Sequence, residues 1–251
     1  SIRLKLKLNN ISAAEGLLAK ANKLGYKNDP RINVIAGDIA LNKKNLGRAY
    51  SFYAKGLTNR DNRALVKLAR ISHEDKYSKK FIPLIESFLA KNPNNITART
   101  TLAEHLMLKK HLEKAKYHYQ ILLTKNIPID QRAIALNNIA GIYIEEKQYQ
   151  SAVQFAQQAV ATTNTIPALL DTYGWALSLS GKYKDGLGYL RQAYTMASSN
   201  IEVQYHLAFT LHKLGRIDEA VEFLEGLSFL PKENDIAIKA KALLSEINGA
   251  V

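Results

Sequence analysis

Histidines and carboxylates are the side chains of this 251-residue sequence that could hold a metal ion or transfer a proton. Two imidazoles on one helix face need a spacing of four residues, and the sequence contains neither that spacing nor an HExxH motif. Three of the histidines fall within residues 96–132, with no carboxylate pattern beside them that would complete a set of metal ligands. We expect no metal site, and we expect solvated or interhelical positions for the six histidines, which are His73, His105, His111, His118, His206 and His212.

Nucleophile and cofactor motifs give no better evidence of chemistry. The chain has no cysteine, which removes thiolate nucleophiles, disulfides and thiolate zinc sites together. Gly186 and Gly188 in DGLGYL resemble a fragment of a dinucleotide fingerprint, but no strand pattern precedes them. A Walker-type loop and a GxSxG elbow are both absent from the sequence. The sequence therefore predicts that the chain is not an enzyme and binds no cofactor, unless a catalytic domain lies outside it.

Charge is distributed unevenly between the two halves of the chain. The net charge is +13, and residues 1–125 hold 25 Lys or Arg against 9 Asp or Glu, whereas residues 126–251 hold 10 against 13. An electropositive half raises the local concentration of anionic partners. The alternative is that these charges are ordinary solvated helix faces. No apolar run approaches the roughly 18 residues that a membrane span needs.

Three consecutive segments of 34 residues, namely 133–166, 167–200 and 201–234, share one pattern of small and bulky positions. The eighth and twentieth places hold small residues, which are Ala140 and Ala152, Gly174 and Gly186, and Ala208 and Ala220. Two antiparallel helices approach closely only where such small side chains cross. Gly181 and Gly215 fall where the first helix of a pair would end, because glycine accepts the left-handed conformation that closes a helix.

This 34-residue period resembles that of the tetratricopeptide repeat (TPR) family. The resemblance implies an all-α fold, a right-handed α-solenoid of helix-turn-helix repeats, with about six repeats plus partial terminal ones. We expect a single superhelix over residues 1–251 that is a fragment of a longer protein. Its expected divisions are a partial repeat 1–29, repeats 30–61, 62–95, 96–132, 133–166, 167–200 and 201–234, and a capping helix 235–251.

Two segments fit the repeat less well. In residues 62–95 Ala69 holds the eighth place, but Phe81 stands where a second small residue is expected. The first eight residues, SIRLKLKL, alternate apolar and basic side chains, which alone favours a strand. Because they precede the expected second helix of a partial repeat, we predict that they are the remnant of a first helix.

In TPR arrays the first helices of successive repeats line a concave groove, so the resemblance implies a binding surface there. The residues expected to face the groove are Asn137, Asn138, Asp171, Thr172, Trp175, Tyr205, His206, Phe209 and His212. An exposed tryptophan is costly unless a partner covers it, although Trp175 could instead pack between helices. Asn137 and Asn138 could hold a peptide backbone or could tie neighbouring helices together. Further upstream, the corresponding places form a basic patch of Arg31, Arg63, Lys67 and Arg70.

The segments ALNNIAGIYIE, LDTYGWALSLSGKY and VQYHLAFTLHKLGRIDEA give a narrower resemblance. They are similar to the C-terminal repeats of large bacterial TPR proteins, in particular the PrsT-type lipoproteins of PEP-CTERM and exosortase systems. The residues that carry this resemblance are Asn137, Asn138, Ala140, Asp171, Thr172, Gly174, Trp175, Tyr205, His206, Leu207 and Ala208. It implies a periplasmic or membrane-attached place in the cell envelope, near exopolysaccharide production and export, although this sequence lacks the lipidated cysteine of such lipoproteins.

The expected function is a non-catalytic protein–protein interaction scaffold in bacterial exopolysaccharide or cell-envelope assembly or export, with a protein or peptide in the groove. The alternative is a binder of an anionic polymer through the basic N-terminal half. An acidic polysaccharide fits that alternative better than nucleic acid, because no aromatic-interleaved basic motif of the RNA-binding kind occurs. Binding of an anionic polymer would weaken steeply with salt. Neither the partner nor the compartment follows from the sequence, so a cytoplasmic location stays open.

Overall fold

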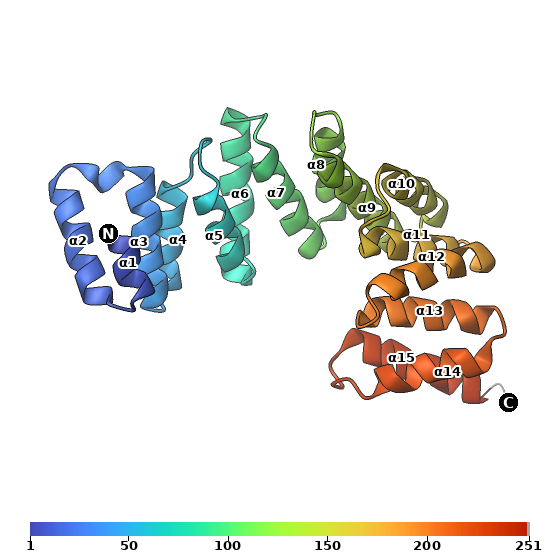
Figure 1. Ribbon diagram of the computed structural model, residues 1–251. Helices are drawn as coiled ribbons and strands as arrows, with labels where there is room; N and C mark the ends of the chain where they lie inside the picture. The colour runs from blue at the N-terminus through green and yellow to red at the C-terminus, as the bar shows by residue number, and fades with distance from the viewer. Residues whose placement is uncertain (250–251) are drawn as a thin grey trace. The chain divides into compact units, whose positions relative to one another are not determined.

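The computed structural model describes residues 1–249, and its elements are helices (Figure 1). Within residues 1–249 there are fifteen α-helices, one short 3-10 helix (η1, Tyr26–Asn28) and no β-strand. Thr58 and Asp61 form an isolated backbone bridge in a connecting turn. The all-α prediction is confirmed.

The chain divides into two compact units, residues 1–118 and residues 119–251, which are described one at a time. The predicted single superhelix therefore stays a prediction. The first unit holds α1 (Ile2–Lys7), α2 (Ile11–Lys23), α3 (Pro30–Asn42), α4 (Leu46–Lys55), α5 (Arg63–Ile71), α6 (Asp75–Lys91) and α7 (Ile96–Leu108). The division falls within α8 (Leu112–Leu123). The second unit holds α9 (Ile129–Glu145), α10 (Tyr149–Thr162), α11 (Pro167–Leu179), α12 (Tyr183–Met196), α13 (Ile201–Lys213), α14 (Ile217–Ser228) and α15 (Asp235–Gly249). Residues 250–251 of the predicted capping helix lie outside the described residues.

The alternating N-terminal segment is helical, as predicted, and not a strand. The Ser1 hydroxyl accepts a hydrogen bond from the Leu4 backbone N–H, which caps the start of α1. Ile2 and Leu6, four residues apart, are partly buried, whereas Leu4 and Leu8 are exposed. The spacing of the buried positions is therefore that of a helix, and the alternation in the sequence has no structural counterpart.

Left-handed residues close the first helix of most pairs. In each of these turns the next residue donates its N–H to a carbonyl five residues earlier, at 2.8–3.0 Å, as in a Schellman motif. Gly181 (φ 87°) and Gly215 (φ 75°) occupy this place, as predicted. The other turns place Asn9, Lys44, Lys110 and Lys147 there, with φ between 53° and 59°. The turn geometry is therefore common to both units, while the residue that carries it differs.

Small residues let the helices of each pair approach closely in the second unit. A Cβ atom built onto Gly186 would lie 2.7 Å from the carbonyl oxygen of Gly174, and one built onto Gly174 would lie 2.9 Å from that of Gly186. These distances are shorter than real Cβ contacts, so the backbones of α11 and α12 nearly touch. The matching alanines of the adjacent pairs are each 0% exposed, and they are Ala140, Ala152, Ala208 and Ala220. The predicted crossing of small residues is confirmed.

The pair of α5 and α6 lacks this close crossing. Phe81 is 0% exposed, and its ring centroid lies 4.7 Å from that of His105 on α7. Ala69, at the other crossing place, is only partly buried. Pro83 lies inside α6 and removes a donor from its hydrogen-bond ladder. A large buried ring thus replaces the contact between small residues, which explains why the pattern is weak in this segment.

Candidate binding surface

A group of aromatic side chains joins two first helices of the second unit. We call Asp171, Trp175, Tyr205, His206 and Phe209 the aromatic cluster. The Trp175 ring on α11 stacks on the His206 ring on α13, with centroids 4.2 Å apart and an interplanar angle of 11°. The Phe209 ring meets Trp175 edge-on at 5.1 Å and 82°, and Tyr205 does so at 6.3 Å and 65°. These edge and stacked geometries are the favourable ones for ring pairs.

Core residues on the same helices fix where the cluster lies. On α11 Tyr173, Gly174 and Leu177 are buried, and on α13 Leu207 and Leu211 are buried. The cluster residues alternate with these positions and are each only partly buried. Trp175 is therefore both packed between helices and accessible, which combines the two interpretations that the sequence left open.

A polar contact ties the same two helices together. Asp171 Oδ1 lies 2.9 Å from Nδ1 of His206, and the two side chains are 13% and 17% exposed. Asp171 and Trp175 are four residues apart, so their side chains leave the same face of α11. The carboxylate holds the imidazole in the plane that stacks on Trp175. Contacts within the chain therefore hold the ring face of the cluster in one orientation.

The cluster continues toward α15. Lys213 Nζ lies 5.4 Å from the ring centroid of Phe209, a cation–π contact. Glu246 Oε1 lies 3.5 Å from both Lys213 Nζ and His212 Nε2. Burial, with a smaller effect of Glu246, raises the pKa of Tyr205 above its ordinary value. Predicted residue His212 thus lies at the edge of the cluster, beside charges of both signs.

The two asparagines on α9 have different surroundings. Asn138 Nδ2 donates to the Tyr119 hydroxyl at 2.9 Å, which supports the alternative that it ties neighbouring helices. The Asn137 side-chain oxygen is buried and has no hydrogen-bond partner among residues 1–249. No hydrogen bond between described residues joins either asparagine to the aromatic cluster. Thr172 lies beside Asp171 on α11, outside the ring stack.

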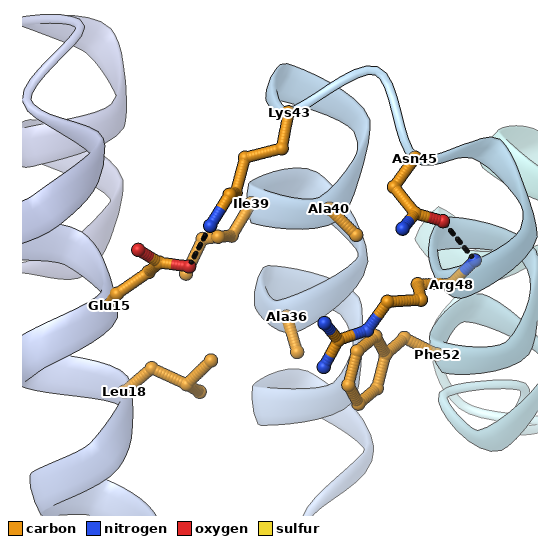
Figure 2. Close-up of a pocket in the computed structure, with 9 residues that line it drawn as sticks. All are labelled: Glu15, Leu18, Ala36, Ile39, Ala40, Lys43, Asn45, Arg48 and Phe52. Atoms are coloured by element: carbon orange, nitrogen blue, oxygen red, sulfur yellow. Dashed lines mark hydrogen bonds and ion pairs between the residues drawn. The ribbon is translucent and has the colours of Figure 1, made fainter.

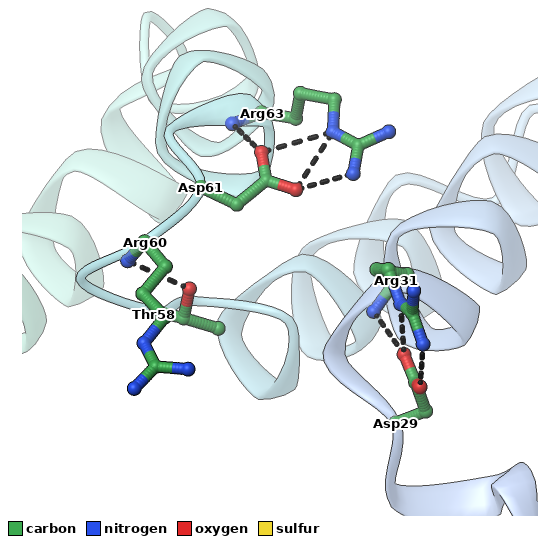
Figure 3. A network of polar contacts seen from close by, with 6 residues as sticks. All are labelled: Asp29, Arg31, Thr58, Arg60, Asp61 and Arg63. Atoms are coloured by element: carbon green, nitrogen blue, oxygen red, sulfur yellow. Dashed lines mark hydrogen bonds and ion pairs between the residues drawn. The ribbon is translucent and has the colours of Figure 1, made fainter.

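Acidic neighbours pair three of the four residues of the predicted basic patch. Arg31 forms an ion pair at 2.8 Å with Asp29, which lies two residues before it. Arg63 forms the equivalent ion pair with Asp61, two residues before it (Figure 3). Hydrogen bonds from these arginines lower the pKa of Asp29 and of Asp61 to about 2. Lys67 binds Asp38 at 2.6 Å and lies over the Tyr53 ring. These local pairs reduce the net field of the patch.

The remaining residue of the patch, Arg70, forms no ion pair within residues 1–249. It lies at the end of α5 and is exposed to solvent. The patch therefore contributes one unpaired positive charge and not four. Sequence reasoning missed the pairing, although the Asp-x-Arg spacing at residues 29–31 and 61–63 was the available signal.

Histidines near α7 are part of the core. His105 Nε2 lies 2.8 Å from Ser78 Oγ, and burial lowers the pKa of His105 to about 4. His118 Nδ1 lies 3.2 Å from Arg99 Nη1, and burial followed by this guanidinium lowers its pKa. Both imidazoles are therefore neutral near pH 7. Among residues 1–249, no group of three His, Cys, Asp or Glu side chains is arranged to hold a metal ion.

A small pocket between α2, α3 and α4 was not predicted (Figure 2). Its apolar wall is formed by Leu18, Ala36, Ile39, Ala40 and Phe52. At its rim Glu15 and Lys43 form an ion pair at 2.8 Å, and Arg48 points in beside Phe52. The volume of about 180 Å³ is below the roughly 300 Å³ where ligand pockets begin.

Paired helices, small residues at their crossings and an aromatic surface on the first helices define a helical repeat scaffold of the TPR type. Residues 50–234 match the model of a family described as the tetratricopeptide repeat protein 21 C-terminal ARM domain, and the chain belongs to that family. Comparison with curated proteins gives no match. TPR-type proteins generally mediate protein–protein interactions without catalysis, and the comparisons indicate no enzyme family.

Solved structures agree on the fold. A tetratricopeptide repeat protein from Parabacteroides merdae superimposes with a TM-score of 0.68 at 14% identity, covering 88% of this chain and 87% of its own. PilF of Pseudomonas aeruginosa gives 0.66 at 14%, covering 87% and 99%. PilW, a type IV pilus biogenesis factor, gives 0.65 at 13%, covering 84% and 97%. At these identities the likeness shows the fold alone, and it confirms the predicted TPR-like solenoid class.

No helix within residues 1–249 is both long enough and apolar enough to cross a membrane.

Proposed function

We propose that the chain is an interaction scaffold that binds a peptide segment of another protein across the first helices α11 and α13. The observation that carries this proposal is the stacking of Trp175 on His206, with Phe209 against its edge, at a surface that stays partly accessible. Large aromatic side chains at such places dominate the energetics of protein interfaces.

The geometry of the cluster reduces the cost of binding. The Asp171–His206 contact and the ring stack hold Trp175 in one orientation, so little side-chain entropy is lost when a partner covers it. The exposed ring surface favours an apolar or aromatic side chain of the partner. Lys213 and Glu246 beside it offer one charge of each sign to the partner's backbone or polar groups.

Affinity measurements on selected peptides test this proposal. Peptides are first selected from a random library on the wild-type chain, and their dissociation constants are then measured by calorimetry. Trp175→Ala should weaken binding by about 2 kcal/mol, or roughly 30-fold, as for an interface hot spot. Tyr189→Ala is the matched control, because Tyr189 also pairs with a ring, Tyr173, but lies on the second helix α12.

In this proposal the control variant keeps the wild-type affinity within a factor of about two. If both variants bind the peptides as tightly as the wild type, the aromatic cluster is not the binding surface. If both lose affinity equally, the loss reflects a general disturbance of the helix pair α11 and α12.

The setting of this activity is part of the same proposal. We place it in assembly at the bacterial cell envelope, near exopolysaccharide export, supported by the resemblance of the C-terminal repeats to PrsT-type lipoproteins. The fold shared with PilF and PilW is consistent with such a setting. Fractionation of the native cells tests it, because the proposal predicts the full-length protein in the envelope fraction and a cytosolic protein contradicts it.

A second candidate function is binding of an anionic polymer, such as an acidic polysaccharide, through the basic half. It rests on the 25 basic against 9 acidic residues of positions 1–125. Reversing Arg63, Lys67 and Arg70 to glutamate should abolish salt-sensitive binding if the predicted patch is responsible. The pairing of Arg63 and Lys67 with aspartates makes this patch the weaker of the two candidates.

A further inference from the structure

A groove between the second helices α4 and α6 in the first unit concentrates positive charge. Lys55 at the end of α4, and Lys76 and Lys80 in the first two turns of α6, line it. Its volume of about 580 Å³ lies within the roughly 300–1,000 Å³ of ligand pockets. Within residues 1–249 none of these three ammonium groups forms an ion pair.

Some other lysines of the same unit, unlike these three, have a carboxylate partner. Lys43 binds Glu15 at 2.8 Å, and Lys109 binds Asp75 at 2.5 Å. Asp75 precedes Lys76 in the chain, yet its carboxylate is engaged by Lys109, the residue after α7. Like charges around one opening repel one another, and an anion placed among them relieves that repulsion.

Two tyrosines lie beside these lysines. Tyr50 on α4 stacks on Tyr77 on α6, with ring centroids 5.4 Å apart and an interplanar angle of 22°. Lys76 Nζ lies 5.8 Å from the Tyr77 ring centroid. Gly47 also lines the groove, and its Cα side faces the Tyr77 hydroxyl, which would lie 3.7 Å from a Cβ atom built there.

The Tyr50 hydroxyl is a second feature that favours a ligand site. Tyr50 is 8% exposed, and its hydroxyl oxygen is buried without a hydrogen-bond partner among residues 1–249. A buried hydroxyl without a partner is unfavourable, and native proteins rarely keep one. Burial raises the pKa of Tyr50 to about 12, so the group remains a hydrogen-bond donor at neutral pH.

We propose that the groove between α4 and α6 binds a phosphate-type anion, with Lys55, Lys76 and Lys80 supplying charge and Tyr50 supplying a hydrogen bond, direct or through one water. Lysine ammonium groups act as point charges toward phosphate, and an anion with more than one negative charge gains more from three such groups than a monovalent carboxylate does. The site uses second helices and lies outside the predicted basic patch. It therefore stands independently of peptide binding at the aromatic cluster.

Calorimetric titration of the whole chain with inorganic pyrophosphate, at constant ionic strength, tests this site. The triple variant Lys55→Gln, Lys76→Gln and Lys80→Gln should weaken pyrophosphate binding at least about tenfold. Tyr50→Phe keeps the ring stack and should weaken binding by roughly fivefold to tenfold. Without pyrophosphate, Tyr50→Phe should melt at or above the wild-type temperature, because it removes an unpaired buried hydroxyl.

The matched control is Lys23→Gln, Lys27→Gln and Lys91→Gln, which removes the same charge from exposed lysines of the same unit. In the proposal it keeps the wild-type affinity. Equal losses in both triple variants overturn the site, because they indicate general attraction of an anion to a basic protein. Failure of pyrophosphate to bind, or binding by Tyr50→Phe that equals the wild type, also overturns it. Acetate that binds as tightly as pyrophosphate contradicts the phosphate class.

Sedimentation with vesicles distinguishes the source of the phosphate. Vesicles of phosphatidylcholine with added phosphatidic acid should bind the wild type, and not the groove variant, if the phosphate belongs to a lipid headgroup. Pyrophosphate binding with no retention on these vesicles supports a soluble phosphorylated ligand at the same groove. Retention of the groove variant equal to that of the wild type contradicts a lipid bound there.

Discussion

The two units of the chain solve the same packing problem with different side chains. In the second unit the helices of a pair cross at glycines and alanines, and the buried polar side chains among residues 119–249 are Ser178 and Thr210. In the first unit the buried polar side chains are Asn33, Ser72, Ser78, Arg99, His105 and His118. The first unit also buries small residues at its crossings, where Ala49, Ala103 and Ala115 are each 0% exposed, but it adds more hydrogen-bonded polar side chains to its core than the second unit does.

This difference explains where the two candidate surfaces lie. A close crossing of α11 and α12 at Gly174 and Gly186 leaves the first-helix face of α11 and α13 free to carry half-buried rings. In the first unit the first-helix charges of the predicted patch are mostly paired, and the three groove lysines without an ion pair, Lys55, Lys76 and Lys80, lie on the second helices α4 and α6. The unit with the more regular repeat is thus not the unit that carries these three unpaired positive charges.

Alanine at one of two neighbouring glycines should produce the largest stability change. Gly186→Ala places a Cβ atom 2.7 Å from the Gly174 carbonyl oxygen, so we expect a loss of at least about 3 kcal/mol in the free energy of unfolding. Gly188→Ala on the same helix meets no atom within 4 Å and should gain up to about 1 kcal/mol through helix propensity. Urea denaturation followed by circular dichroism measures both. If the two variants change the free energy of unfolding equally, the close crossing of α11 and α12 does not stabilise the second unit.

Acid should weaken the first unit before the second. The folded pKa of His105 is about 4, against an ordinary 6.5, so the unfolded chain binds more protons between these values. Stability is therefore complete above pH 6.5 and falls as the pH is lowered toward 4, by about 2–3 kcal/mol at pH 4.5. Hydrogen exchange resolved by peptide should show this loss in α7 and not in α11.

Histidine variants sharpen this pH comparison. His105→Gln should remove most of the dependence between pH 6.5 and 4.5, because glutamine can bond to Ser78 without titrating. His73→Gln, at an exposed histidine, should leave the dependence unchanged. A pH dependence that survives His105→Gln in full would assign it to other groups, such as His118.

Exchange of turn residues between the units should have the smallest effect. Lys44 in the first unit has a φ of 57°, where glycine avoids the strain of a side chain, so Lys44→Gly should stabilise by roughly 0.5–1 kcal/mol. Gly181→Lys in the second unit, at a φ of 87°, should destabilise by about 1 kcal/mol. Thermal melting of the two variants measures these shifts. Effects of the same sign would contradict a shared turn geometry.

Much of the fold followed from the sequence because the 34-residue period records local contacts. Gly174 with Gly186, and Gly181 at the turn, stand at fixed places whose physics is known without the structure. The helix α1 was predicted from its position, since the alternation of its side chains favoured a strand. Phe81 marked the repeat in which the crossing fails.

The parts that did not follow depend on contacts between repeats. Asp171 and His206 are 35 residues apart, and their hydrogen bond arises only when neighbouring first helices are set side by side. The pairing of Lys67 with Asp38 likewise joins two repeats. The groove lysines stand on second helices, where the TPR resemblance places no binding residues. A single period cannot specify which charges of successive repeats meet.

Trp175 is the sole tryptophan of the sequence, so its fluorescence reports on the aromatic cluster alone. Titration with a peptide selected on the wild-type chain should shift the emission to shorter wavelength and protect the ring from iodide quenching. The midpoint of that change should equal the dissociation constant from calorimetry. A peptide that binds by calorimetry while the emission and quenching of Trp175 stay unchanged would contradict the proposed binding surface.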